Sequence, residues 1–132
     1  MPNVMAKRHV VAKRRITERS LHATIVDWLR LVLPRGVILQ HAPGEGRRGW
    51  VGARDLIILG YKAGWPDIEL LWSSKVAFAE IKAIDGRLTP VQIACHAELR
   101  QAGFIVEVVR SLEAMRQFLI DRGIPFNQAV HL

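Results

Sequence analysis

The sequence has a single cysteine and no long hydrophobic run. Because Cys95 stands alone, an internal disulfide and a zinc site built from several cysteines are both excluded. No apolar stretch reaches the length of a transmembrane helix, and the N-terminus lacks the apolar core of a signal peptide. We therefore expect a soluble, intracellular (cytoplasmic) protein without a membrane partner.

Acidic residues are also scarce. The 132 residues include 19 lysines and arginines but only 12 aspartates and glutamates, which gives a formal charge of +7. This excess predicts a polyanionic partner such as nucleic acid, although it would also suit a ribosomal or membrane-surface protein. The length is typical of one domain, and a hydrophobic fraction of 50% is enough for a core.

The first 15 residues are basic and show little periodicity. They contain five lysines and arginines and no acidic residue. Such a segment can bind phosphates through counterion release, or it can be an ordinary solvated tail. We expect a flexible basic arm over residues 1–15 and a single domain over residues 16–132.

Hydrophobic periodicity and capping residues predict an α/β fold. Strand 76–82, helix 90–102 and strand 104–109 form a crossover unit, which should be parallel and right-handed. Thr89 is the expected N-cap of this helix, and Gln92 would complete a capping box. The other expected elements are helix 17–33, strand 37–41, helix 51–59, strand 68–72 and a helix that Ser111 caps and Gly123 ends.

The most informative feature is a pair of motifs, Gly64-Trp65-Pro66-Asp67 and Glu80-Ile81-Lys82. A two-residue turn at Ser73-Ser74 would pair Trp72 with Lys75. The same register places Asp67 directly opposite Glu80, on a sheet face that Lys82 shares.

Two opposed carboxylates destabilise a sheet unless a cation offsets them. Mg²⁺ takes oxygen ligands, so Asp67, Glu80 and the backbone carbonyl of Ile81 are candidate metal ligands. Mg²⁺ bound there would lower the pKa of a water and polarise a phosphoryl oxygen, while Lys82 would stabilise the developing charge or help deprotonate the water. The alternative is that Asp67 is a turn residue and that Glu80 and Lys82 are the polar face of an edge strand.

Asp67 with Glu80-Ile81-Lys82 resembles the motif of PD-(D/E)xK nucleases. The first motif together with Gly86-Arg87-Leu88-Thr89-Pro90-Val91-Gln92 resembles the VRR-NUC branch, and the resemblance runs from about residue 18 to about residue 119. It implies a restriction-endonuclease-like core, with a central mixed β-sheet flanked by helices in the order αβ(α)ββαβ and a C-terminal helix. Trp65 departs from the smaller residues that are common at its position.

The resemblance also implies an activity. The chain resembles small stand-alone members of phage or bacterial type, which act on branched DNA such as four-way (Holliday) junctions. The resemblance therefore implies an endonuclease that depends on Mg²⁺, with Mn²⁺ as a substitute. Symmetric cleavage of a four-way junction needs two active sites, so we expect a two-fold homodimer. No small-molecule cofactor is expected.

Two further site residues come from the resemblance. Many family members place a glutamate of the first helix beside the metal, which indicates Glu18, although an acid there also favours the helix dipole. They place a glutamine near the active site, which indicates Gln92, although the capping box alone would explain that residue. The candidate catalytic residues are therefore Asp67, Glu80, Lys82, Gln92 and Glu18.

Four residues are candidate DNA contacts, namely His41, Arg47, Arg48 and Lys62. The loop over residues 43–49 has three glycines and two arginines, which suits close approach to phosphates, although a plain solvent loop would look the same. His41 ends a strand and could bind metal or DNA, or be an ordinary strand-end histidine.

Several observations are left open. Glu69 shares the face of Asp67 but is left out of the metal set, and Cys95-His96 has no partner at ligand spacing and is interpreted as packing. A non-catalytic DNA-binding module on a nuclease-like scaffold is the alternative to an enzyme. An enzyme that acts on RNA also stays open, because no residue here reads a 2′-hydroxyl or a base.

Overall fold

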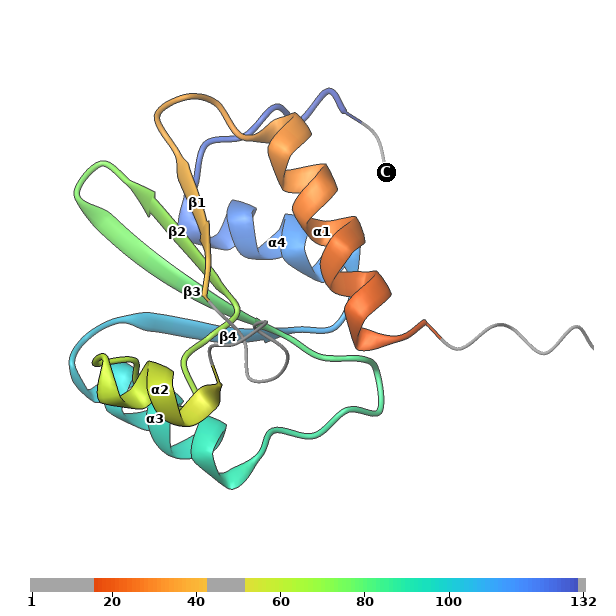
Figure 1. The fold of residues 1–132 in the computed structure, drawn as a ribbon. Coiled ribbons are helices and arrows are strands. Elements are labelled where there is room, and N and C mark those ends of the chain that lie inside the picture. The colour runs from red at the N-terminus through yellow and green to blue at the C-terminus, as the bar shows by residue number, and fades with distance from the viewer. Residues whose placement is uncertain (1–15, 43–51, 131–132) are drawn as a thin grey trace, which may run out of the picture.

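A computed structural model describes residues 16–42 and 52–130 (Figure 1). The elements in chain order are α1 (Glu18–Val32), β1 (Ile38–His41), α2 (Ala53–Ile58), β2 (Ile68–Trp72), β3 (Lys75–Ile81), α3 (Pro90–Gln101), β4 (Ile105–Val109) and α4 (Leu112–Arg122). This order confirms the predicted fold class. The predicted arm over residues 1–15 lies outside the described residues. None of the helices in the two described ranges is both long and apolar enough to cross a membrane.

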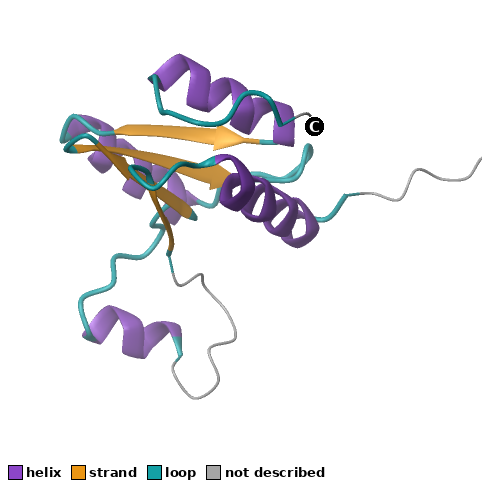
Figure 2. Cartoon of the chain, turned by 90° about the horizontal axis from the view of Figure 1, so that it is seen from above, coloured by secondary structure: helices purple, strands orange, loops and turns teal. Residues whose placement is uncertain are grey.

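The four strands form one mixed sheet in the order β1-β2-β3-β4. β1 and β3 both pair antiparallel with β2, whereas β4 pairs parallel with β3, as the crossover unit predicts. Helices α1 and α4 lie on one side of this sheet and α3 lies on the other (Figure 1). The view from above shows α2 standing apart from the sheet (Figure 2).

The main core lies between the sheet and helices α1 and α4. Alternate residues of β2 and β3 point into it, and α1 adds one apolar stripe. Its large, fully buried members include Ile25, Leu29, Ile68, Leu70, Ile81, Met115, Phe118 and Leu119. A smaller cluster of Phe78, Cys95, Leu99 and Val106 lies on the α3 side. Cys95 therefore packs in a core, as predicted.

The β2–β3 hairpin has the predicted register. Ser73 and Ser74 both adopt positive φ, 43° and 61°, as a tight two-residue turn requires. Trp72 pairs with Lys75, and the pairing continues to Ile68 opposite Ala79. One further step along the two strands leads to Asp67 and Glu80, at the open end of the hairpin.

The chain that enters β2 packs tightly against the start of α3. Gly64 has φ of +80°, and a Cβ atom there would lie 2.5 Å from the carbonyl oxygen of Val91. Only glycine fits this close approach without strain. The contact holds the first turn of α3, with Gln92, beside the residues that lead into Asp67.

We predict that Gly64→Ala destabilises the fold by about 2 to 5 kcal/mol, because it adds a backbone clash to an unfavourable left-handed conformation. Gly60→Ala is the matched control. Gly60 also has positive φ, +103°, but a Cβ there meets nothing within 4 Å. The control should therefore lose only about 1 to 2 kcal/mol. Guanidinium unfolding followed by circular dichroism measures both, and equal losses would contradict the close approach.

Candidate active site

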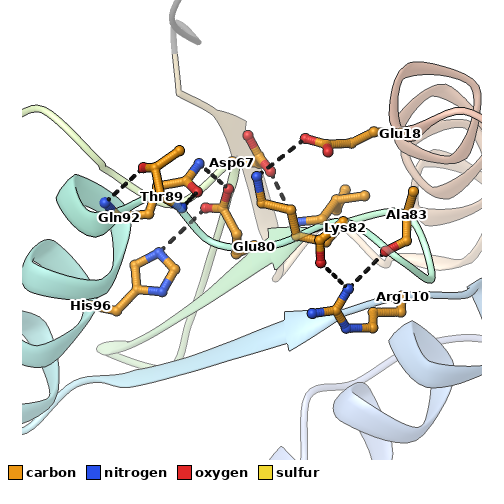
Figure 3. A network of polar contacts seen from close by, with 11 residues as sticks. Glu18, Asp67, Glu80, Lys82, Ala83, Thr89, Gln92, His96 and Arg110 are labelled. Atoms are coloured by element: carbon orange, nitrogen blue, oxygen red, sulfur yellow. Dashed lines mark hydrogen bonds and ion pairs between the residues drawn. The ribbon is translucent and has the colours of Figure 1, made fainter.

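Asp67 is anchored between two strands. Its Oδ2 accepts a hydrogen bond of 2.9 Å from the backbone N–H of Ile81. Its carbonyl oxygen accepts a bond of 3.0 Å from the N–H of Ala42, just after β1. These bonds fix a half-buried carboxylate at the open end of the hairpin, beside β3 (Figure 3).

Glu80 is almost fully buried, with an exposed fraction of 1%. Gln92 Nε2 donates a hydrogen bond of 2.9 Å to Glu80 Oε1. The same amide's Oε1 accepts from the N–H of Thr89 at 3.0 Å, which completes the predicted capping box. Capping therefore orients the Gln92 amide so that its NH₂ group faces Glu80, and both interpretations of Gln92 hold together.

His96 also lies against Glu80, which sequence reasoning missed. The ring is fully buried, and its Nε2 is 3.4 Å from Glu80 Oε2. The interpretation of Cys95-His96 as packing did not include this contact with Glu80. A signal was present in the sequence: His96 follows Gln92 by four residues, and residues at that spacing share one helix face.

The burial of Glu80 changes its protonation. Burial, and then the charge of nearby Asp67, raise the pKa of Glu80 to about 8, against the opposing charge of Lys82. Burial also lowers the pKa of His96. At neutral pH the contact between Glu80 and His96 thus joins two uncharged groups.

Lys82 lies on the side of the site that faces α1. Its side chain is buried, and its Nζ is 3.8 Å from Oε1 of the more exposed Glu18 (Figure 3). Arg110 holds the chain after Lys82, because its Nη1 donates to the carbonyls of Ala83 at 2.7 Å and Gly86 at 2.6 Å. These hydrogen bonds fix the backbone that directly follows Lys82.

Two histidines flank Asp67. His41 Nδ1 is 2.9 Å from the carbonyl oxygen of Asp67. Since a carbonyl only accepts, Nδ1 is the donor in this contact. His22 contacts His41 edge-on, with ring centroids 4.6 Å apart, and burial lowers its pKa against the charge of Asp67. Sequence reasoning missed His22, although it follows Glu18 by one helical turn.

The five candidate catalytic residues thus come together, and His41 joins them. Lys62 does not, because it pairs with Glu98 of α3 at 2.5 Å. Arg47 and Arg48 lie outside the described residues. Ile81 contributes its backbone N–H to Asp67.

Comparison with protein families matches residues 4–113 to the VRR-NUC domain. The chain belongs to the VRR-NUC family. This is a family of nuclease domains. The fold agrees: a solved structure described as a "VRR_NUC domain protein" superposes with a TM-score of 0.63 at 18% identity, over 81% of this chain and 88% of that one. At that identity the similarity shows a shared fold. No curated protein matches.

A nuclease domain raises the question of a metal. Within residues 16–42 and 52–130, no group of three or more histidine, cysteine, aspartate or glutamate side chains could hold one. Mg²⁺ needs fewer protein ligands, since one or two carboxylates with waters and substrate phosphate suffice. Asp67 and Glu80 of the VRR-NUC domain fit this requirement. Glu80 Oε2 is buried with no hydrogen-bond partner among the described residues.

We predict that Glu80→Gln stabilises the VRR-NUC domain in the presence of chelator. Between pH 4.5, where an ordinary glutamate titrates, and about 8, folded Glu80 retains a proton that the unfolded chain releases. Rising pH therefore costs the wild type stability over this interval, by at most about 1.4 kcal/mol per pH unit. The advantage of the variant should grow across the interval and level off above it.

Urea unfolding at a series of pH values measures this difference. The control is Glu113→Gln, which removes an exposed carboxylate in the first turn of α4. If the stability advantage of Glu80→Gln stays constant from pH 4.5 to 8, the pKa of Glu80 is not raised.

Proposed function

We propose that this VRR-NUC domain is a Mg²⁺- or Mn²⁺-dependent endonuclease that hydrolyses phosphodiester bonds of DNA and prefers branched structures such as four-way junctions. One observation carries the proposal: Asp67, Glu80 and Lys82 converge at the open end of one hairpin. Two carboxylates beside an ammonium group suit a divalent cation together with a phosphate.

Each residue has a separate task in this proposal. Asp67 and Glu80 would hold the metal, with the Ile81 carbonyl as a further candidate ligand. The metal would polarise the phosphoryl oxygen and lower the pKa of the attacking water. Lys82 would donate to the phosphate oxygen on which charge develops, from a buried position where such a donor acts strongly.

The surroundings of the site leave part of it accessible to DNA. Glu80 and His96 are buried, whereas Glu18 of α1 and His41 of β1, which lie beside Lys82 and Asp67, are exposed. The net charge of +7 favours a polyanion. A two-fold homodimer would supply the two sites that symmetric cleavage of a four-way junction requires.

We predict that Lys82→Met and Asp67→Asn each slow cleavage by about a hundred- to thousandfold, because each removes one charged group and keeps the side-chain volume. The control is Lys75→Met, which removes an exposed lysine at the far end of β3. Single-turnover rates on labelled DNA measure the effect. If Lys82→Met cleaves DNA at the wild-type rate, the catalytic role assigned to Lys82 is wrong.

The substrate test offers labelled four-way, flap and linear duplex DNA with Mg²⁺, Mn²⁺ or chelator. Paired symmetric nicks on the junction alone support the proposal in full. Equal cleavage of all three substrates would remove the structure preference. Binding without cleavage in either metal would favour a non-catalytic DNA-binding module.

We predict that His96 holds Glu80 in position for the metal. His96→Leu should weaken Mn²⁺ binding by about 10- to 100-fold, as loss of a group behind a metal ligand does elsewhere. It should lower kcat more than it raises KM for DNA. His96→Asn keeps an N–H donor and should restore part of the affinity.

Isothermal titration calorimetry with Mn²⁺ and no DNA gives the affinities. Cys95→Ala is the matched control, because Cys95 is the neighbouring buried residue and packs toward Phe78 instead. If His96→Leu and Cys95→Ala bind Mn²⁺ as tightly as the wild type, His96 has only a packing role.

A further inference from the structure

A hollow opens on the α3 side of the sheet, next to the candidate active site. Helix α3 covers Phe78 of β3 and Val106 of β4, and the hollow lies over Gln40 of β1 and Glu69 of β2. The hollow has a volume of about 270 Å³, and its lining includes Gln40, Tyr61, Lys62, Trp65 and Glu69. That is room for about nine water molecules at roughly 30 Å³ each, or for one flat ring system.

The hollow lies within reach of a nucleotide held at Asp67. Glu69 follows Asp67 by two residues, so their Cα atoms are about 7 Å apart. Gln40 pairs directly with Glu69 across β1 and β2. Trp65 precedes Asp67 by two residues in the same motif.

The aromatic wall of the hollow is held in place. Trp65 Nε1 donates a hydrogen bond of 2.5 Å to Glu69 Oε1. The indole also contacts Phe78 edge-on, with ring centroids 5.3 Å apart. These two contacts hold the half-buried indole in place, so a base that stacks on it causes little loss of side-chain conformational entropy.

The charge of the lining favours a base over a phosphate. Among the described residues of the lining, Glu69 carries a carboxylate, and Lys62 is already paired with Glu98. A phosphate would meet net repulsion here. A nucleobase could stack on Trp65 and donate an amino hydrogen to Glu69, whose oxygens each accept more than one bond.

We infer that the hollow binds an unpaired nucleobase of the DNA strand, next to the phosphodiester bond at Asp67 and Glu80. The identity of the ligand as DNA rests on the proposed function. Stacking on Trp65 and an amino-group contact with Glu69 hold the base. Only bases that can leave the duplex reach such a hollow, so it favours branch points and single-stranded segments.

The test measures binding of short single-stranded oligonucleotides at fixed salt with chelator present, so that no cleavage occurs. Trp65→Leu, which keeps apolar bulk without an aromatic face, should weaken binding of oligo-dC by about 5- to 150-fold, the range for loss of one base–aromatic stack. Trp65→Phe should keep most of the affinity. Glu69→Gln should reduce the preference for oligo-dC over oligo-dT.

An abasic sugar–phosphate oligonucleotide separates stacking from backbone contact. Trp65→Leu should leave its binding unchanged, and unchanged Mn²⁺ binding and thermal unfolding would show an intact fold. Equal weakening of the abasic and oligo-dC ligands, or no weakening of either, overturns the base site. This test needs no cleavage, so it can distinguish the two proposals. If the protein binds a base in the hollow but cuts no DNA, the nuclease proposal is refuted and the base site is not.

Discussion

The register between β2 and β3 is the constraint around which the rest of the site is arranged. The Ser73-Ser74 turn sets that register, and the pairing brings Asp67 and Glu80 to the open end of the hairpin. The hydrogen bond from the Ile81 N–H to Asp67 then holds the first carboxylate beside the second strand. Two acids are thereby forced together, against the electrostatic preference of the bare chain.

Residues of helix α3 contact one of these acids, Glu80. Gln92 binds one oxygen of Glu80, and His96, one turn later, lies against the other. The capping box with Thr89 restricts the Gln92 amide, and Gly64 lets the helix start lie close to the chain before Asp67. Burial of Glu80 costs stability, as its raised pKa shows. A cost of this kind is typical of functional sites, where stability is sacrificed for a prepared geometry.

The site has two unlike sides. Toward α3 it is closed, because Glu80 and His96 are buried there and Gln92 donates to Glu80. Toward α1 it is more open, with Glu18 beside Lys82 (Figure 3). His22 and His41 lie beside Asp67 on the same side. The buried groups toward α3 can therefore hold Glu80 in place, whereas the exposed groups toward α1 can contact a substrate. The hollow beside Trp65 lies on the α3 side of the sheet and gives the proposed substrate strand a second point of contact.

Local sequence determined the elements, the hairpin register and the capping of α3, because alternation, turn residues and caps act between near neighbours. It therefore also placed Asp67 opposite Glu80, with Lys82 on the same face. The site roles of Glu18 and Gln92 were expected from the family resemblance. Tertiary structure alone decided that His96 meets Glu80, that His22 meets His41 and that Lys62 pairs with Glu98. Helical periodicity assigns a residue to a face, but the position of that face against the sheet depends on packing between distant segments. The approach at Gly64 and the hollow over β1 and β2 have the same origin: each depends on how closely α3 packs and on how much of the sheet it covers.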